Sequence, residues 1–372
     1  METLKINFIQ YSTERTGGTR TLLNYANELN NLGHEVSFTT LYHDPWFSLN
    51  DGVRVITKKT KFSLYYYYSS IVIHNKIGKT SLGAEFSLLK KLVNMAPEAD
   101  INVSSFPPTA YVASWLSHKA LPFYLLMHDP IFFATDKFQK QFYNDTLFLP
   151  VNKIVNSIWL QRRIYDRTQI EFPIMNTGAV NPQIFKPASD ITREGRKNEI
   201  HIVALGKGGF KNSKLIKDAV EIVRRNNLNI SVFLHFFGHR LPGNIILDSQ
   251  TFFHKDLDDV ELARLYSKCD IQVTTSTAES FPLPPLEAMA CGCSVITTPY
   301  GTEDYAIDNV NCLIVRPDDV SDLVSKIELL IFDPSLQKKL KTEGLKTSMR
   351  FSYAKQSKDL EAYFKSKMDS DQ

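Results

Sequence analysis

Hydrophobic positions at the start of the chain alternate between short apolar runs and longer stretches with helical spacing. The run Lys5–Tyr11 predicts a strand, and a glycine-containing turn at Thr16–Thr19 follows it. Leucine, tyrosine and alanine side chains then recur every three or four positions until Gly33, which is well placed to end a helix. Val36–Thr39 begins the next predicted strand. This alternation is typical of a parallel α/β sheet.

The same pattern extends through the rest of the chain with one interruption. Further apolar runs that predict strands lie at residues 101–104, 123–127, 153–155, 200–205, 231–237, 271–274, 294–298 and 312–315. The interruption, Pro187–Glu199, is polar and charged and contains Gly195, which is typical of a linker. The pattern therefore predicts two doubly wound domains, residues 1–188 and 189–351. Ligands in such sheets bind beyond the carboxyl ends of the strands, so we expect a site in a cleft between the domains.

Composition excludes several classes of protein. The chain has 372 residues, of which 43% are hydrophobic and 22% charged, which indicates a globular protein and excludes a disordered, collagenous or coiled-coil chain. Neither uncharged stretch is suited to span a membrane, because Phe62–Asn75 is short and rich in tyrosine and Ile101–His118 is broken by two prolines. The acidic N-terminus enters a strand at once, so we do not expect a signal peptide.

The few cysteines favour a reducing compartment. The four are Cys269, Cys291, Cys293 and Cys312. A chain of this length can hold its fold without bridges, so we expect reduced thiols and a cytoplasmic protein. One residue separates Cys291 from Cys293, which is too few for a CxxC motif, so the sequence does not favour zinc.

Charge is distributed unevenly along the chain. Residues 1–188 hold 19 lysines and arginines against 14 acidic residues, and eight of the 19 lie in Arg54–Lys91, beside Phe62 and Tyr65–Tyr68. One interpretation is a solvated insertion. Another is a surface for anionic lipid headgroups or a lipid-linked acceptor, with peripheral contact at the inner face of a membrane. We do not expect nucleic acid as a partner, because no nucleic-acid module is visible.

The most informative segment is Ala278–Gly292, in which two glutamates stand eight positions apart. Glu279 follows a predicted strand, and Glu287 opens a helix of small residues. A glutamate at a helix start is favoured by the helix dipole alone. A carboxylate can also accept hydrogen bonds from sugar hydroxyls, and a helix start can receive a phosphate. One loop could therefore bind both ends of a nucleotide sugar.

This segment resembles the E-x7-E loop of the retaining glycosyltransferases of family 4, which have the GT-B fold. Other segments resemble the family in the same order and spacing over nearly the whole chain. They are Thr16–Gly18, Asn156–Ser157, Asn176–Gly178, Phe185–Pro187, Cys269–Val273, Gly292, Val295–Thr298 and Gly301–Glu303.

The resemblance implies two Rossmann-like domains that face a central cleft. Residues 1–188 would form the acceptor-side domain, residues 189–351 the donor-binding domain, and a helix at about 352–372 would cross back to the first. The implied activity is transfer of a hexosyl or deoxyhexosyl group, with retention, from a nucleotide-diphosphate sugar to a hydroxyl of a glycan or lipid-linked acceptor. The implied role is surface polysaccharide or glycan assembly, with no cofactor and no metal.

In the second domain the resemblance assigns roles to two groups of residues. Glu279 would bind the donor sugar hydroxyls, and Glu287 the ribose of the nucleotide. Lys207 and Lys211 would bind the diphosphate and stabilise its developing charge. The backbone of Ser280, Phe281 and Leu283 would approach the sugar and phosphate. The alternative interpretation is that the two lysines lie in a solvated loop and bind no ligand.

In the first domain the resemblance adds a histidine and a glycine loop. His128 would contact the donor sugar and, with Glu279 and Lys211, make up the catalytic set. A lone histidine is otherwise more often structural. Gly17 and Gly18 would let the first loop approach the acceptor and the donor, respectively. Arg15 and Arg20 would lie on the acceptor side.

The chain departs from the family pattern at several positions. Pro282 replaces a glycine, which removes a backbone N–H and leaves the identity of the donor sugar open. Lys207 replaces an arginine, and its loop to Lys211 is short. Asn311–Cys312 replaces the common Asn-Gly.

A possible metal motif has a simpler explanation. Asp256–Asp259 contains a DxD, which binds a divalent metal in a different glycosyltransferase fold. Here apolar residues at helical spacing follow, so Asp258 or Asp259 is predicted to cap a helix.

Other functions remain open at this point. The chain could be a non-catalytic nucleotide-sugar or glycan-binding protein of the same fold, or another GT-B enzyme such as an epimerase or a phosphorolytic enzyme. A Rossmann dehydrogenase is disfavoured, because no G-x-G-x-x-G follows the first strand.

Overall fold

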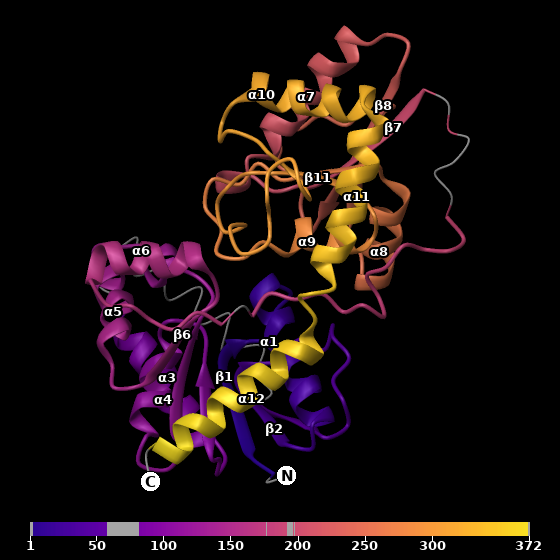
Figure 1. Cartoon of the computed structure of the whole chain (residues 1–372). Helices are drawn as coiled ribbons and strands as arrows, with labels where there is room; N and C mark the ends of the chain where they lie inside the picture. Colours follow the sequence, from indigo (N-terminus) through magenta and orange to yellow (C-terminus); the bar gives the residue numbers. More distant parts are fainter. Residues whose placement is uncertain (1–2, 58–81, 176, 192–195, 197, 371–372) are drawn as a thin grey trace. The chain divides into compact units, whose positions relative to one another are not determined.

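A computed structural model describes residues 3–57, 82–175, 177–191, 196 and 198–370 (Figure 1). The chain forms two compact units, a first domain of Met1–Thr177 with Tyr353–Gln372 and a second domain of Gly178–Ser352. The structure thus divides the chain earlier than the predicted boundary after residue 188. The physical reason is that Val180 and Phe185 are buried in the hydrophobic core of the second domain. Part of the predicted linker and most of the basic aromatic segment lie outside the described residues.

The first domain contains a parallel sheet in the order β3-β2-β1-β4-β5-β6. Its strands are β1 (Lys5–Ser12), β2 (Glu35–Tyr42), β3 (Val53–Thr57), β4 (Ile101–Ser104), β5 (Leu121–Leu126) and β6 (Asn152–Val155). Its helices are α1 (Gly17–Asn31), α3 (Leu82–Met95), α4 (Thr109–Trp115), η1 (Pro130–Phe133), α5 (Lys137–Asp145), η2 (Thr146–Phe148), α6 (Ile158–Thr168) and α12 (Tyr353–Ser370).

Helices cover both faces of this sheet because strand side chains alternate between them. Ile9 of β1 packs into one core with Leu89 of α3 and Val112 of α4. On the other face, the ring of Phe123 in β5 contacts that of Phe364 in α12, with centroids 4.6 Å apart. The sheet is therefore buried on both sides, as a parallel sheet requires.

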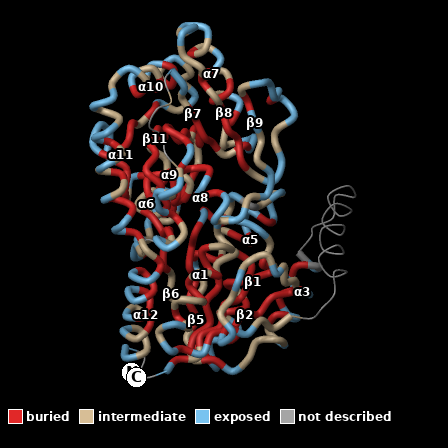
Figure 2. Tube along the Cα trace, turned by 90° about the vertical axis from the view of Figure 1, so that its right-hand side faces the viewer, coloured by how far each residue is buried: buried red, intermediate tan, exposed pale blue. Residues whose placement is uncertain are grey.

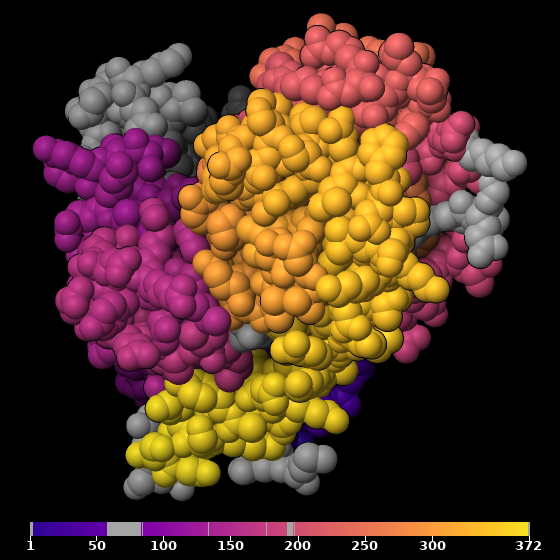
Figure 3. Space-filling model, turned by 45° about the horizontal axis from the view of Figure 1, so that its top comes forward, coloured from indigo at the N-terminus to yellow at the C-terminus, as the bar shows by residue number. Residues whose placement is uncertain are grey.

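Helix α12 belongs to the first domain although it follows the second domain in sequence. The Tyr25 hydroxyl of α1 donates a hydrogen bond to Gln356 Oε1 of α12 at 3.1 Å. The rings of Tyr25 and Tyr353 meet edge to face. The outer side of α12, drawn in yellow, stays on the molecular surface (Figure 3). This confirms the prediction that the final helix crosses back.

The second domain repeats the architecture with the strand order β12-β11-β10-β7-β8-β9, again parallel. Its strands are β7 (Glu199–Leu205), β8 (Ser231–Gly238), β9 (Thr251–Lys255), β10 (Ile271–Val273), β11 (Ser294–Thr297) and β12 (Leu313–Ile314). Its helices are η3 (Gly209–Lys211), α7 (Ser213–Asn226), α8 (Asp259–Lys268), α9 (Leu283–Ala290), α10 (Val320–Phe332) and α11 (Pro334–Ser348).

Two hydrophobic cores hold this second sheet. On one face, Ile202 of β7 packs with residues of α7, α10 and α11, and on the other Val203 packs with residues of α8 and α9. Figure 2 shows the buried residues concentrated along the strands and the inner sides of the helices. Within the part of the chain that the structure describes, no helix combines the length and apolar composition needed to cross a lipid bilayer.

Three histidines form a chain of ring contacts across β7, β8 and β9. His201 Nδ1 lies 2.9 Å from His235 Nε2, and His235 Nδ1 lies 3.1 Å from His254 Nε2. Burial lowers the pKa of all three rings and brings the pKa of His235 to about 3. The central ring, His235, is therefore neutral at pH 7.

The DxD motif caps α8. Asp258 accepts a hydrogen bond from the backbone N–H of Glu261, whose side chain accepts in turn from the backbone N–H of Asp258. This capping box confirms the predicted role of Asp258. Among the described residues, no group of three or more histidine, cysteine, aspartate or glutamate side chains could hold a metal ion. Metal independence stays a prediction.

Candidate active site

The candidate site lies where the order of the second sheet reverses. β7 pairs with β8 on one side and with β10 on the other, so the loops after β7 and β10 leave neighbouring strands in opposite directions. Open α/β sheets bind their ligands at such a switch point. The loop after β7 carries Lys207 and Lys211, and the loop after β10 carries Glu279. The topology thus brings together residues that are distant in sequence.

Hydrogen bonds to backbone carbonyls hold the two loops to each other. Thr275 Oγ1 donates to the carbonyl oxygens of Lys211 and Asn212, each at 3.0 Å. The backbone N–H of Thr277 donates to the carbonyl of Phe210 at 2.8 Å. Thr275 is 1% exposed, so this link is protected from water. The backbone of the lysine loop is therefore fixed relative to the strand that leads to Glu279.

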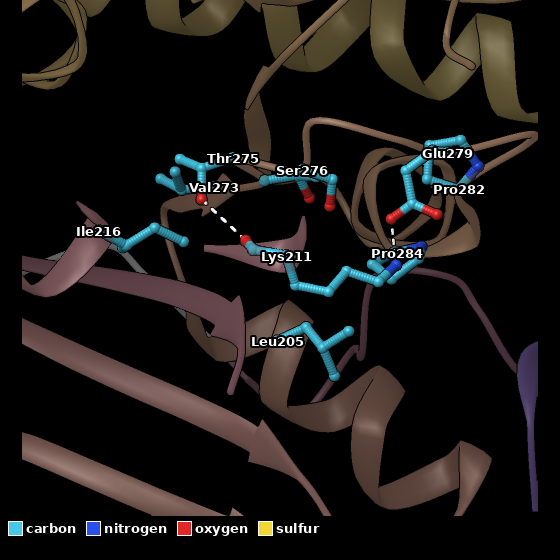
Figure 4. Close-up of a pocket in the computed structure, with 10 residues that line it drawn as sticks. Leu205, Lys211, Ile216, Val273, Thr275, Ser276, Glu279, Pro282 and Pro284 are labelled. Atoms are coloured by element: carbon cyan, nitrogen blue, oxygen red, sulfur yellow. Dashed lines mark hydrogen bonds and ion pairs between the residues drawn. The ribbon is translucent and has the colours of Figure 1, made fainter. Parts of the chain in front are cut away.

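The side chains of Lys211 and Glu279 form an ion pair between Nζ and Oε1 (Figure 4). The lysine side chain is 15% exposed and the glutamate side chain 8%. The ammonium group also lies 5.2 Å from the centroid of the Phe210 ring. The Lys211 side chain, from the loop after β7, and the Glu279 side chain, from the loop after β10, point toward one another.

A pocket surrounds this ion pair. It is lined by Leu205, Lys211, Ile216, Val273, Thr274, Thr275, Ser276, Glu279, Pro282 and Pro284. Leu205 and Ile216 on the β7 side are aliphatic, and Thr274, Thr275 and Ser276 after β10 carry hydroxyl groups. Such a mixture of apolar walls with a few fixed polar groups is typical of a small-molecule site.

The backbone of the Glu279 loop is fixed by a glycine and a tyrosine. Gly301 has φ +72°, and a Cβ atom there would lie 2.7 Å from the carbonyl carbon of Glu279. The Tyr305 hydroxyl donates to the carbonyl of Pro282 at 2.8 Å. Burial raises the pKa of Tyr305 well above its usual value, so this donor stays protonated. Both residues act on the backbone that carries Glu279.

A cluster of aromatic side chains packs around Phe281 of the same loop. The ring of Phe281 lies 5.2 Å from that of Tyr305 and 5.8 Å from that of Phe351. A Cβ atom at Gly178 would overlap the Phe281 ring, so this packing requires glycine there. Phe281 is therefore buried in the domain core, and the approach of its backbone to a ligand stays a prediction. Ser280 and Leu283 on either side of this turn are buried as well.

Glu287 and Lys207 lie outside the ten residues that line the pocket. Glu287 is 1% exposed, and Tyr266 donates to its Oε2 at 3.4 Å. Lys207 is exposed, and its backbone N–H donates to Ser213 Oγ at 2.7 Å. The ribose role of Glu287 and the diphosphate role of Lys207 stay predictions.

The first turn of α9 is poor in N–H donors. Pro282 is the N-cap with φ −69°, and Pro284 and Pro285 follow in the first turn. Proline has no N–H, so the start of this helix offers an anion fewer hydrogen bonds than an ordinary helix does. The Lys211 side chain should therefore attract an anion in this pocket more strongly than the start of α9 does.

In the first domain, the glycine loop and the histidine lie close together. Gly17 and Gly18 open α1, whose N-cap Thr16 accepts a hydrogen bond from the backbone N–H of Thr19. A Cβ atom at Gly18 would lie 4.0 Å from the sulfur of Met127, the residue before His128. The β1 and β5 loops of this domain therefore meet at one edge.

The other predicted residues of the first domain occupy the same edge. His128 is exposed, and its ring lies 6.5 Å from that of Phe132. The Arg15 guanidinium lies 5.4 Å from the centroid of the Trp46 ring. Arg20 is half-buried in the first turn of α1. The catalytic role of His128 and the acceptor-side roles of Arg15 and Arg20 stay predictions.

Sequence reasoning missed the residue that anchors His128. Asp129 is 3% exposed and accepts two hydrogen bonds from Arg167, each at 2.9 Å, and one from Arg163 at 2.7 Å. These bonds tie the loop after β5 to α6. The signal in sequence was weak, because the aspartate is followed by a proline and the arginines come more than thirty positions later.

Part of the chain matches a known protein family. Residues 190–347 match the family described as glycosyl transferases group 1. The serotype-specific mannosyltransferase WbdA of Escherichia coli is 34% identical over 106 residues, which are 28% of this chain and 13% of WbdA. A D-inositol 3-phosphate glycosyltransferase of Stackebrandtia nassauensis is 31% identical over 123 residues, which are 33% of this chain and 28% of that protein. The chain therefore covers only a small part of each relative.

Solved structures match over almost the whole chain. Sucrose-phosphate synthase from Thermosynechococcus elongatus has a TM-score of 0.74 at 16% identity, over 98% of this chain and 99% of that one. HepE of Anabaena, solved with UDP and glucose, has a TM-score of 0.74 at 17% identity, over 98% and 100% of the two chains. The chain has the GT-B fold. The predicted fold class is confirmed.

Proposed function

We propose that the protein is a retaining glycosyltransferase that moves a hexosyl group from a nucleotide-diphosphate sugar to a hydroxyl of a glycan or lipid-linked acceptor. One observation carries the proposal. Lys211 and Glu279 converge in one pocket at the switch point of a domain that matches the group 1 glycosyl transferases. A cation for a diphosphate beside a carboxylate for sugar hydroxyls is the donor set that such a reaction needs.

The pocket favours a particular route for retention. Glu279 is the carboxylate among the ten lining residues, and the proposal assigns it to the hydroxyl groups of the donor sugar rather than to attack on a sugar carbon. In the proposed reaction the acceptor oxygen forms its bond to the anomeric carbon on the face from which the diphosphate departs. The bond from that carbon to the phosphate oxygen breaks, and the acceptor proton passes to the leaving phosphate. Lys211 stabilises the charge on that phosphate.

The biological setting belongs to the same proposal. WbdA is a serotype-specific mannosyltransferase, and HepE was solved with UDP and glucose. We therefore propose that nucleotide-linked mannose or glucose is the donor class, and that the product is a surface polysaccharide or a related glycan assembled in the cytoplasm. Catalysis would need no metal, because Lys211 supplies the charge that a metal supplies elsewhere.

Two substitutions and a control test the site. Glu279→Ala and Lys211→Ala should each lower turnover at least ~100-fold, the loss expected when a transition-state contact is removed. Lys214→Ala is the matched control, since Lys214 lies three positions further along and pairs with Asp218 on an exposed face of α7. Release of nucleoside diphosphate should be measured over a panel of nucleotide sugars and acceptors. Near-normal turnover in both pocket variants would show that this pocket is not the active site.

A non-catalytic nucleotide-sugar-binding protein remains the alternative. Pro282 is the feature that favours it, because it removes an N–H donor from the start of α9. Thermal unfolding with the same nucleotide sugars, without added metal, separates the two functions. Stabilisation without any transfer or hydrolysis would favour a binding protein, and turnover that needs inorganic phosphate would favour a phosphorolytic enzyme.

A further inference from the structure

The charge balance of the pocket is zero as the structure stands. Its ten lining residues include one cation, Lys211, and one anion, Glu279, and these two are paired with each other. A diphosphate that enters the pocket gains the attraction of Lys211 only if the ammonium leaves Glu279. Both side chains are largely removed from water, so separating them is costly unless each finds a new partner.

The two loops hold the pair in place. Thr275 fixes the carbonyls of Lys211 and Asn212, and Gly301 packs against the backbone of Glu279. These contacts oppose separation of the loops when the lysine side chain turns away from the carboxylate. The lysine side chain has several rotatable bonds, so it can turn without a movement of the backbone.

A nucleotide sugar and a nucleoside diphosphate differ in what they offer this pair. The nucleotide sugar brings a diphosphate for Lys211 and hydroxyl groups that can donate to Glu279, so both charges are satisfied. The nucleoside diphosphate brings the anion without the hydroxyl groups of the donor sugar, so Glu279 is left without its cation and beside a second negative charge. The pair therefore resists the product more than the substrate.

We propose that the Lys211–Glu279 ion pair is a latch that discriminates the donor from the spent nucleoside diphosphate and promotes release of the latter. When the sugar has been transferred, Glu279 loses its hydroxyl partners and takes Lys211 back from the diphosphate. The inference rests on the proposed function, because it assumes that the pocket binds a nucleotide-diphosphate sugar. It adds a role for Glu279 in product release to the role in sugar binding.

A double-mutant cycle tests the latch. The dissociation constants of ADP, GDP, UDP, CDP and TDP are measured by calorimetry for the full-length protein, Glu279→Gln, Lys211→Met and the double variant. With the nucleotide that binds best, Glu279→Gln should bind at least about tenfold more tightly than the natural chain, since no carboxylate must give up its cation. In the Lys211→Met background the same change should bring no gain.

The results of the double-mutant cycle distinguish failure of the latch from failure of the proposed function. Unchanged or weaker binding by Glu279→Gln overturns the latch while leaving nucleotide binding intact. A gain that persists in the Lys211→Met background also overturns it, because simple repulsion between Glu279 and the phosphates would then explain the gain. If none of the diphosphates binds either chain and no transfer is seen, the proposed function fails and the latch with it. Glu279→Ala repeats the cycle should the glutamine variant not fold.

Discussion

Thr275→Val removes one hydroxyl from the link between the two loops of the candidate site. The hydroxyl donates to the carbonyls of Lys211 and Asn212, each at 3.0 Å, and Thr275 is 1% exposed. Valine has nearly the same shape, so packing is retained. The loss is one buried hydrogen bond with its acceptors left behind, about 1–2 kcal/mol. For a domain of this size each kcal/mol lowers the unfolding midpoint by about 2–4 °C.

The same substitution should also lower turnover. With the link gone, the backbone of Lys211 is held less firmly, and a contact to a developing charge is sensitive to small displacements. Calorimetric unfolding gives the midpoint, and release of nucleoside diphosphate gives the turnover number, which should fall about tenfold or more. Thr277→Val is the control, because its Oγ1 lies 3.4 Å from the Phe210 carbonyl and forms a weaker bond. Equal effects of the two changes on midpoint and turnover would refute the reasoning.

Two further predictions concern the second domain. Gly301→Ala should lower both stability and turnover, because the new methyl group meets the backbone of Glu279; Gly33→Ala, at φ +94° with open space around it, should cost only the roughly 1–2 kcal/mol of a left-handed alanine. The pKa of His235 is about 3 in the folded protein and about 6.5 in an unfolded chain. The contribution of the neutral His235 ring to the free energy of unfolding is therefore fully present above pH 6.5 and is lost as the pH falls toward 3. His235→Phe should reduce the slope of unfolding free energy against pH near pH 5 by about 1.4 kcal/mol per unit, and a slope unchanged in urea unfolding would show that another group takes up the protons.

The central strands of both sheets could be predicted because they are buried on two faces. Such strands contain continuous apolar runs, as in Phe123–Leu126 and Ile202–Leu205, and the structure has strands β5 and β7 there. The two strands that the sequence did not indicate, β3 and β9, lie at sheet edges. Each has only five residues and a mixture of charged and apolar side chains, so its run is not distinct from a loop.

The candidate site was predictable only in part. Family resemblance pointed to Lys211 and Glu279, and the structure brings them together in one pocket. Thr275 and Tyr305 could not be found in the same way. Their contribution is to bind backbone carbonyls of other loops, and a hydroxyl that does so looks in sequence like any other buried threonine or tyrosine. Such roles depend on tertiary contacts between segments that local patterns do not connect.

The place of α12 has a consequence for the order in which the protein assembles during synthesis. Residues 1–177 leave the ribosome before the second domain, and α12 is made after the second domain. Until then the faces of Phe123 and Tyr25 that α12 covers stay open to water. At ordinary rates of translation this interval is on the order of ten seconds or more, long enough for the second domain to fold first. Of these two domains, the one that is made earlier is thus completed later, and the apolar surface that α12 covers stays exposed in the interval.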